Sequence, residues 1–354
     1  MNARTLHRRL GVALALFWLV QAATGMALVF RWELDAAILA APQVRLDIDA
    51  LGERIESLDR AGAKVTSMWS APATTGAFDI YYADASGASR VMRIDGSGRA
   101  LRDRSARRLV ADGAVFDSIE SLHEFLFAGV LGRWLIAISG ALLLTTLILG
   151  LRQVWPQLWS WRSTLFALPR GPARLRVRAW HRFVGIWGVF PALLVVVAGL
   201  TLASSNAFGP ASPSETPGPV KAASAAPIIG PAEVLKTALA LHPGSTLSAL
   251  QMPANERDRY AVRVRAPHEM RRNWGTTRVL IAARDGAVIA DQPAASLSTA
   301  RGLLDAAYPI HTGQIFGWGS RALVLLVGLW LITLVSLGIQ SWWRSVGAGP
   351  RAAR

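Results

Sequence analysis

The 354-residue sequence contains no cysteine, and this absence removes several kinds of site at once. It excludes disulfides, thiolate metal centres, iron–sulfur clusters and cofactors attached through C-x-x-C-H. A metal would have to be bound by histidine, by carboxylates or by a cofactor. The chain also lacks a G-x-G-x-x-G segment, a Ser/His/Asp set, paired catalytic carboxylates and a metalloprotease motif. Nucleotide binding and hydrolysis are therefore not indicated.

Charge is nearly absent from four long stretches, although 17% of all residues are charged. The mean hydropathy of +0.32 is high because apolar residues are concentrated in these stretches. At a helical rise of ~1.5 Å per residue, each can cross a hydrocarbon core of ~30 Å. Backbone groups in lipid must bond to each other, so we expect four transmembrane helices. They are Gly11–Phe30, Leu131–Leu151, Phe183–Leu202 and Ala322–Ile339.

Acidic residues are missing between residues 152 and 182, whereas arginine is abundant there and near both ends of the chain. Short basic segments remain in the cytosol. We therefore expect this segment and both termini to be cytosolic, and the two long segments to lie outside. The net charge of +15 is attributed to these flanks and not to nucleic-acid binding. The N-terminal run resembles a secretory signal peptide. We reject that interpretation, because the run is long for a signal peptide and the third span repeats its pattern.

The sequence repeats itself at two offsets. At an offset of 174, the first span aligns with the third, and His7 falls on His181. At an offset of 188, the second span aligns with the fourth, and His123 falls on His311. Four glycines are matched in the same way, Gly25 with Gly199 and Gly150 with Gly338. Both copies begin in the cytosol, so we expect parallel repeats related by a pseudo-two-fold axis along the membrane normal.

The long outer segments also correspond to each other. Each contains a helical stretch, 47–61 or 231–241, followed by three strand-like runs, 64–70, 77–83 and 89–95 or 246–252, 259–266 and 276–284. The predicted fold is a mainly α membrane protein, with a four-helix transmembrane bundle from two parallel repeats and two small α/β periplasmic modules. Its segments are span 1 (1–33), module 1 (34–116), outer histidine segment and span 2 (117–156), cytosolic loop (157–179), span 3 (180–203), linker (204–230), module 2 (231–304), outer histidine segment and span 4 (305–344) and cytosolic tail (345–354).

The repeat sorts four histidines into two pairs, one at each membrane face. Equivalent residues that point inward face each other across a two-fold axis, and two facing imidazoles suit haem b. Such a haem carries electrons, because both axial positions of its iron are filled. We expect His7 with His181 at the cytosolic haem and His123 with His311 at the periplasmic haem. The alternative is that all four are interfacial residues that touch lipid headgroups. The other two histidines, His242 and His268, fall outside the pairs, and we expect them on a solvated surface.

The arginines beside these histidines are candidates for pairing with haem propionates. They are Arg8 and Arg182 at the cytosolic face and Arg133 and Arg321 at the outer face. Snorkelling to lipid headgroups is the alternative role, equally expected for Arg8 and Arg182.

The outer pair needs a break in the chain, because His123 and His311 precede Arg133 and Arg321 by ten residues. A continuous helix would place them ~15 Å away along its axis. Glycine permits a sharp turn, so we predict a bend in each copy. The glycines are Gly129 and Gly132 in one copy and Gly313, Gly317 and Gly319 in the other. Trp18, Trp187, Phe190 and Trp330 are candidates to line the gap between the haems, although packing is the commoner role of such aromatics.

Four strings resemble the PepSY-associated transmembrane family over nearly the whole chain. They are LHRRLG (6–11), LHEFL (122–126), WHRFVGIW (180–187) and HTGQIFG (311–317). Within that family the chain is similar to inner-membrane ferric-siderophore reductases of Gram-negative bacteria. The resemblance implies two haem b groups bound by the matching histidines. It also implies PepSY-like periplasmic modules and reduction of a periplasmic ferric siderophore that releases Fe(II).

The electron donor and the acceptor stay open at this point. The cytosolic segments are too short for a flavin domain, so electrons would come from quinol or from a separate reductase. A basic run, Arg257, Arg259, Arg263, Arg265, Arg271 and Arg272, is either an attractor of an anionic chelate or a solvated face. Alternative functions are a quinol-linked haem conduit to another periplasmic acceptor and a non-redox protein that binds an envelope partner. A transporter is disfavoured because the spans lack charges at the midplane.

Overall fold

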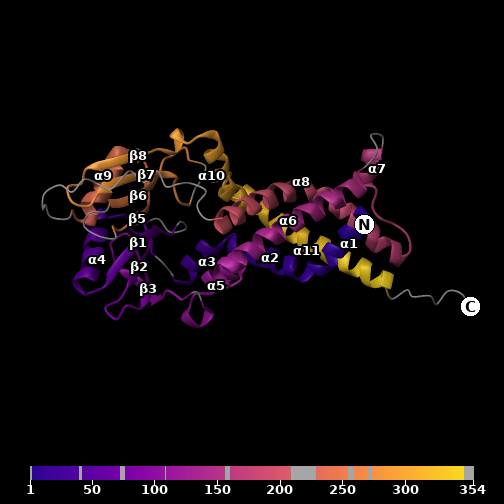
Figure 1. Cartoon of the computed structure of the whole chain (residues 1–354), viewed down its shortest axis with the longest axis horizontal. Coiled ribbons are helices and arrows are strands. Elements are labelled where there is room, and N and C mark those ends of the chain that lie inside the picture. The colour runs from indigo at the N-terminus through magenta and orange to yellow at the C-terminus, as the bar shows by residue number, and fades with distance from the viewer. Residues whose placement is uncertain are drawn as a thin grey trace, which may run out of the picture. The chain divides into compact units, whose positions relative to one another are not determined.

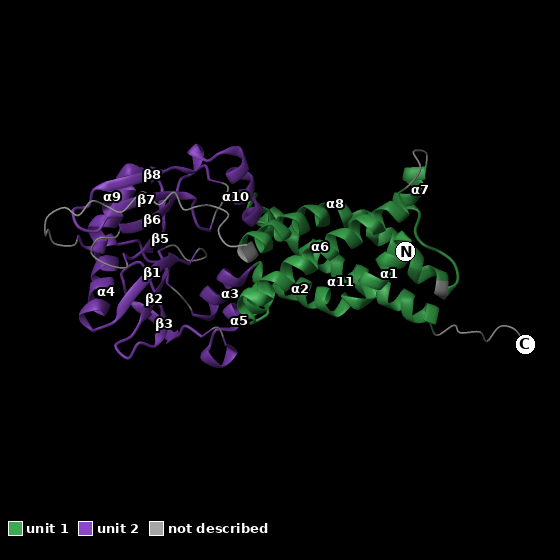
Figure 2. Ribbon diagram, in the orientation of Figure 1, with its two compact units in different colours: residues 1–29, 119–211, 310–354 green, residues 30–118, 212–309 purple. Residues whose placement is uncertain are grey.

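The computed structural model describes residues 2–39, 42–71, 76–107, 109–155, 160–208, 229–253, 259–269 and 273–346. Most of the predicted linker 204–230, most of the tail 345–354 and the start of the loop 157–179 lie outside these residues. The chain forms two compact units (Figure 2). The helical unit comprises residues 1–29, 119–211 and 310–354, and the sheet unit comprises residues 30–118 and 212–309.

The helical unit is built from long apolar helices that pack against each other (Figure 1). Helix α6 contacts α8, α8 contacts α11, and α11 contacts α2, while α1 contacts both α6 and α11. Large apolar side chains such as Leu131, Leu194 and Leu326 stay exposed on these helices, as expected for surfaces that face lipid. The helices are α1 (Ala3–Ala13), α2 (Ala15–Leu28), α6 (Gly129–Val154), α7 (Trp161–Phe166), α8 (Ala173–Phe208) and α11 (Trp318–Val346).

Three of the described helices are long and apolar enough to cross a membrane, namely Gly129–Val154, Leu175–Ser205 and Trp318–Val346. A fourth span exists if α1 and α2 are counted together, because these two helices meet at a bend of 62°. The predicted continuous helix over residues 11–30 is therefore wrong. Leu14 leaves the helical conformation (φ −106°, ψ 4°) and divides the run. Residue 14 is neither glycine nor proline, so the residue type at this position does not predict the break.

The predicted breaks between the outer histidines and spans 2 and 4 are present. Helix α5 (Val115–Phe125) ends at residues in the left-handed region, Leu126 (φ 52°) and Phe127 (φ 55°), before α6 begins. Helix α10 (Thr299–Thr312) ends at Gly313 (φ 73°). In the first break, a Cβ on Gly132 would lie 1.7 Å from the carbonyl oxygen of Phe125. Only glycine therefore allows the two helices to approach this closely.

The sheet unit contains one eight-stranded antiparallel sheet in the order β4-β3-β2-β1-β5-β6-β7-β8. Each half adds a fourth strand, β4 or β8, to the three that were predicted. The two predicted modules share this sheet because β1 pairs with β5, with Met68 opposite Leu250. The strands are β1 (Lys64–Ser70), β2 (Phe78–Ala83), β3 (Ser89–Ile94), β4 (Ala100–Ser105), β5 (Thr246–Gln251), β6 (Arg259–Arg265), β7 (Thr277–Ala282) and β8 (Val288–Gln292).

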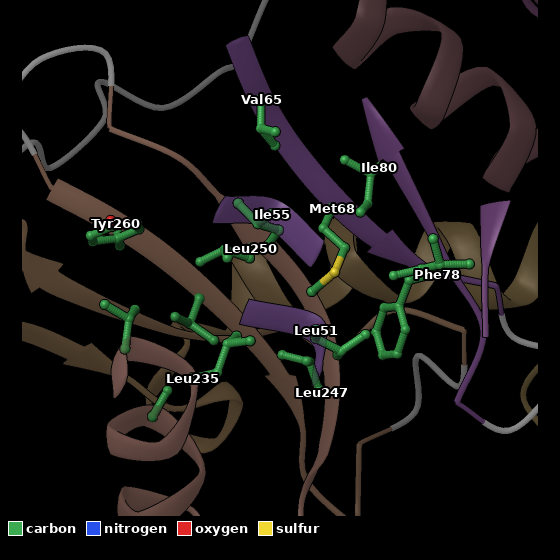
Figure 3. Close-up of a cluster of buried hydrophobic side chains, with 14 of the residues drawn as sticks. Leu51, Ile55, Val65, Met68, Phe78, Ile80, Leu235, Leu247, Leu250 and Tyr260 are labelled. Carbon is green, nitrogen blue, oxygen red and sulfur yellow. The ribbon is translucent and has the colours of Figure 1, made fainter. Parts of the chain in front are cut away.

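Two helices, α4 (Ile48–Arg60) and α9 (Pro231–Leu241), cover one face of the sheet and contact each other. Both begin where the sequence favours a helix, with Asp47 as N-cap acceptor of two backbone N–H groups and Pro231 at the first turn. Leu51, Met68 and Leu250 are fully buried between helices and sheet (Figure 3). Burial of one such side chain contributes about 1.5–3 kcal/mol. Among the described residues, the remaining elements are α3 (Arg31–Ile38) and two short 3-10 turns, Val110–Asp112 and Ala294–Ser296.

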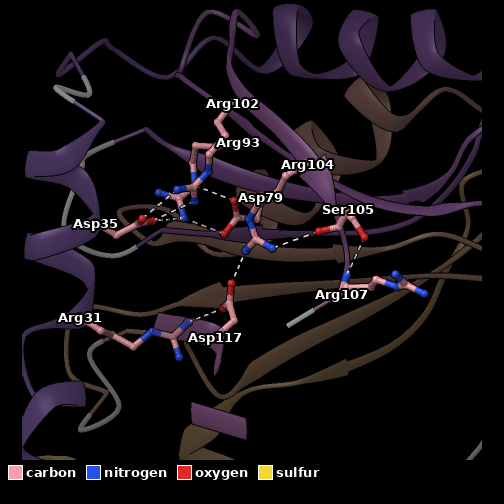
Figure 4. Close-up of polar contacts among 9 residues, drawn as sticks. All are labelled: Arg31, Asp35, Asp79, Arg93, Arg102, Arg104, Ser105, Arg107 and Asp117. Carbon is pink, nitrogen blue, oxygen red and sulfur yellow. Dashed lines mark hydrogen bonds and ion pairs between the residues drawn. The ribbon is translucent and has the colours of Figure 1, made fainter. Parts of the chain in front are cut away.

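A buried ion-pair network lies on the opposite face of the sheet (Figure 4). The guanidinium of Arg93, 3% exposed, donates to both carboxylate oxygens of Asp79 at 2.6 and 2.9 Å and lies 3.1 Å from Asp35 of α3. Arg102 also donates to Asp35 at 3.0 Å. Burial alone would raise the pKa of Asp35, but the hydrogen bond from Arg102 and the nearby positive charges lower it below its ordinary value. Helix α3 is thus tied to the sheet by paired charges.

Asp117, near the start of α5, is held by two further arginines (Figure 4). Arg31 of α3 donates to one carboxylate oxygen at 3.2 Å, and Arg104 of β4 donates to the other. All three side chains are less than one fifth exposed. The first residues of α5, which belong to the sheet unit, are therefore held to α3 and β4 by charge-assisted hydrogen bonds.

Candidate functional site

Two pairs of histidine rings lie inside the helical unit, in the combinations that the repeat predicts. The ring centroids of His7 in α1 and His181 in α8 are 6.3 Å apart. Those of His123 in α5 and His311 in α10 are 6.2 Å apart. Metal–imidazole bonds of about 2 Å on each side, with half a ring beyond each, separate ring centres by roughly 6 Å. Each pair therefore has the spacing that two axial ligands of one metal require.

Hydrogen bonds fix which nitrogen of each inner ring is available. Nδ1 of His7 lies 3.0 Å from the carbonyl oxygen of Thr146, and Nδ1 of His181 lies 3.0 Å from that of Leu334. A carbonyl oxygen only accepts, so Nδ1 carries the proton in both rings. Nε2 of each ring keeps its lone pair, and this is the arrangement found in histidines that bind metals.

The outer pair follows the same rule with one variation. Nδ1 of His311 donates to the carbonyl oxygen of Val195 over 2.9 Å. Nδ1 of His123 lies 3.0 Å from Oγ1 of Thr24, and the His123 ring also has a hydrogen bond with the backbone of Gln21. The Thr24 hydroxyl donates its hydrogen to the backbone carbonyl oxygens of Val20 and Gln21. Its oxygen therefore accepts a hydrogen bond from Nδ1 of His123. Nε2 is again left free in both rings.

Burial affects the protonation of the outer pair, whose helices α5 and α10 lie outside the candidate membrane spans. Burial, together with the smaller effect of the neighbouring His311, lowers the pKa of His123 to about 4. Burial also lowers the pKa of His311. Both rings are neutral at pH 7, and the neutral imidazole is the form that ligates a metal.

A glycine on a neighbouring helix makes room for each ring. A Cβ on Gly199 would lie 2.5 Å from Cε1 of His311, and the corresponding distances are 3.0 Å for Gly25 and His123, 3.1 Å for Gly150 and His7, and 3.3 Å for Gly338 and His181. Each glycine stands four residues after the residue whose carbonyl or backbone bonds to Nδ1. The missing side chain therefore exposes that carbonyl to the ring. The sequence repeat aligns these glycines in pairs, but it did not predict that each one leaves space for a histidine ring.

A cavity of about 510 Å³ opens between the inner rings, and both His7 and His181 line it. This size lies within the range of small-molecule and cofactor pockets. Arg8 and Arg182, the predicted propionate partners, line the same cavity. The cavity thus combines two free imidazole nitrogens, apolar walls and four arginines, because Arg4 and Arg178 line it as well.

The outer arginines contact protein groups near the breaks in the chain. The Cζ atom of Arg133 lies 6.0 Å from the centre of the Phe125 ring, two residues after His123. Arg321 donates to the carbonyl oxygen of Val29, and its Cζ lies 5.3 Å from the centre of the Trp318 ring. The guanidinium of Arg133 therefore stands at the end of α5, whereas that of Arg321 contacts Val29 after α2 and Trp318 at the start of α11.

The four predicted aromatic residues divide into two kinds. Trp18 (2% exposed) donates to Ser139 over 3.2 Å, and Trp330 donates to the carbonyl of Val184 over 2.7 Å; both tryptophans line the inner cavity. Trp187 and Phe190 are 53% and 52% exposed. The prediction that these two line the gap is wrong, because their positions on α8 turn them to the outer surface of the unit.

The other predicted features lie apart from the pairs. His242 bonds to Asp291 over 2.8 Å, and His268 is exposed. Of the basic run, Arg259, Arg263 and Arg265 lie on β6, whereas Arg257, Arg271 and Arg272 are outside the described residues. Over the described part of the chain, no group of three or more His, Asp or Glu side chains is placed to hold a metal ion. A metal between either histidine pair would take its other ligands from a cofactor.

These features define a mainly helical membrane protein with three candidate membrane helices, an antiparallel sheet domain and two internal histidine pairs. Residues 4–345 match the family model described as the PepSY-associated TM region. The chain therefore belongs to that family, as the four histidine strings suggested. Comparison with curated proteins gives no match.

Proposed function

We propose that this protein is a di-haem b electron-transfer protein that reduces ferric-siderophore chelates in the periplasm and so releases Fe(II). The observation that carries the proposal is the pairing of four half-buried histidines, whose ring centroids are 6.3 and 6.2 Å apart, each with Nδ1 engaged and Nε2 free. Haem b, when bound, supplies a one-electron centre whose porphyrin provides the four ligands that the protein lacks and whose iron has no open site.

The residues present fit that group at both sites. His7 and His181 would hold the inner haem, with Arg8 and Arg182 lining the same cavity as partners for carboxylates. His123 and His311 would hold the outer haem, with Arg133 and Arg321 at the adjoining helix ends. The four glycines keep the rings in place from behind, and the Nδ1 hydrogen bonds fix their orientation, as second-shell contacts do in metal sites.

The proposed membrane arrangement counts α1 and α2 as one bent span, giving four spans from two parallel repeats. Both termini lie in the cytosol of a bacterium, and the sheet unit lies in the periplasm beyond the inner membrane. Trp18 and Trp330 are the aromatics available between the sites. An electron that moves outward leaves a negative-inside cell with the field, which favours transfer by ~2.3 kcal/mol per 100 mV.

Reduction of a chelate is chemistry that this chain can perform without a nucleophile or general acid. Siderophores bind Fe(III) through hard oxygen donors, and the softer Fe(II) is held far less tightly. One electron from the protein converts Fe(III) to Fe(II), and the iron then dissociates. Quinol in the membrane or a separate reductase would first reduce the protein by one electron, and the protein returns to its oxidised form when that electron passes to the Fe(III) chelate.

The proposed activity is tested with the purified protein in lipid vesicles, reduced and then mixed with a ferric siderophore under anaerobic conditions. A coloured Fe(II) trap reports release, and haem absorbance reports oxidation of the protein. We expect one trapped Fe(II) for each haem oxidised. Haem that stays reduced in the presence of every ferric siderophore tried would favour a conduit to another periplasmic acceptor, and a protein without haem would favour a non-redox envelope-binding role.

Because these glycines leave space for the rings, replacing one of them should cause loss of haem although both histidine ligands are retained. Gly199→Ala places a Cβ 2.5 Å from His311 and must push the ring away from Val195. We expect the outer haem to be lost or to become high-spin, as seen in the absorption spectrum. Gly319→Ala is the control, because a Cβ there meets no atom within 4 Å. Equal spectra for both variants would contradict the role assigned to Gly199.

A further inference from the structure

Three tryptophans and a tyrosine form a cluster of half-buried rings in the sheet unit. Trp274 is its centre, with ring centroids 5.7 Å from Trp32 of α3, 6.0 Å from Trp69 of β1 and 5.9 Å from Tyr308 of α10. Nε1 of Trp274 donates to the carbonyl oxygen of Ser70 over 3.1 Å, which fixes the orientation of the indole. None of the four rings is fully buried, so they do not form a closed hydrophobic core.

The segment that carries Trp274 is held by polar contacts on both sides. The Glu269 carboxylate accepts from the backbone N–H of Thr277 at 3.2 Å and from its hydroxyl at 2.6 Å, and also from the N–H of Thr276. The hydroxyl of Thr276 donates to Asp305 of α10 over 2.7 Å. The central ring is therefore preorganised, as binding sites require.

Arginines stand beside this cluster on the same face of the sheet. Trp69 follows the fully buried Met68, so it points to the face opposite the core. Along the register, Trp69 lies opposite Ala249, Ala249 opposite Arg263, and Arg263 opposite Arg278. Because Ala249 is small, the guanidinium of Arg263 reaches across it, and its Cζ lies 5.7 Å from the centre of the Trp69 ring.

Arg259 and Arg278 are like charges that repel each other on this side of the row. Burial lowers the pKa of Arg278, and the charge of Arg259 lowers it further. The acid on the other side of Trp69 is Asp79, which is already paired with Arg93 at 2.6 Å. An anion near Arg278 would relieve this repulsion. We call the following six residues the Trp/Arg surface: Trp32, Trp69, Trp274, Tyr308, Arg263 and Arg278.

We propose that the Trp/Arg surface binds an anionic ferric chelate whose iron donors are aromatic, as in a ferric catecholate. Indole and phenol rings stack on flat aromatic donors, and guanidinium groups attract the net negative charge of the complex. A ferric trihydroxamate is neutral and lacks aromatic donor rings, so it offers neither contact. The inference deepens the proposed function and rests on it for the reduction step, but binding does not depend on electron transfer.

The test measures binding of radio-iron chelates to the oxidised full-length protein in nanodiscs by equilibrium dialysis. The probes are the ferric complexes of a synthetic hexadentate tris-catecholate and a synthetic trihydroxamate. We expect the catecholate to bind at least ten-fold more tightly. Trp274→Leu is expected to weaken catecholate binding about three- to ten-fold. Arg263→Gln, which leaves the aromatic rings in place, is expected to do the same with little effect on folding.

Trp187→Leu is the matched control, because this tryptophan is exposed on the helical unit and should leave binding unchanged. Equal or tighter binding of the trihydroxamate would overturn the proposal, as would unchanged catecholate binding in both Trp274→Leu and Arg263→Gln. Because no electron donor is present, these outcomes are independent of haem reduction. A protein that contains both haems but fails this test would keep the proposed function and lose only the inferred substrate class.

Discussion

Replacing His123 with alanine is expected to remove one haem from the protein and leave the other in place. The variant loses one of the two nitrogens of the outer pair, and a single imidazole does not hold a bis-histidine haem. The inner pair is formed by other helices and keeps its cavity of about 510 Å³. We expect the haem content to fall by half, measured as extracted haem per chain, with the spectrum of the remaining haem unchanged.

The control for this variant is His268→Ala, because His268 is exposed and lies in the sheet unit. It should retain the full haem content. The reciprocal variant His181→Ala should lose the haem that His123→Ala retains, so the two remaining spectra should sum to that of the unchanged protein. A His123→Ala protein with full haem content would refute the assignment of His123 as a ligand.

Arg93→Leu is expected to cause the largest loss of stability in the sheet unit. Arg93 is 3% exposed and pairs with Asp79 and Asp35, whose side chains are 10% and 15% exposed. Removing one member of a buried ion pair leaves uncompensated charge and typically costs about 3–5 kcal/mol. We expect the free energy of unfolding to fall by that amount, measured by urea titration of the full chain with hydrogen exchange of the β2 and β3 amides as the readout.

The matched control is Arg60→Leu, in which the lost partner is Glu53. These two side chains are 65% and 63% exposed, and an exposed pair contributes about 0–1 kcal/mol. The haem spectrum should be the same in both variants. If Arg93→Leu cost no more than Arg60→Leu, the network in Figure 4 would not stabilise the sheet.

Local structure in the sheet unit could be predicted closely from the sequence. Strand β1 and helix α9 have the predicted bounds, 64–70 and 231–241, because apolar periodicity and the terminal residues mark both. The pairing of β1 with β5 could not be predicted. It joins Met68 to Leu250, which are separated by about half of the chain, and the outermost strand of each half carries no local sign of its partner.

The candidate site was predictable where the repeat applied. The offsets alone indicated that His7 would meet His181 and that His123 would meet His311. The contacts behind the rings were not predictable, because Gly150 touches His7 only through the packing of α1 against α6. The break at Leu14 could not be predicted either, because neither glycine nor proline stands at that position.

The most direct test of the account is the reduced-minus-oxidised absorption spectrum of the purified protein, combined with the amount of haem per chain. We expect low-spin b-type bands and about two non-covalently bound haems for each chain, as two bis-histidine sites require. A protein that folds and inserts into membranes but shows no b-type signal would contradict the central claim, and the histidine pairs would then need another explanation.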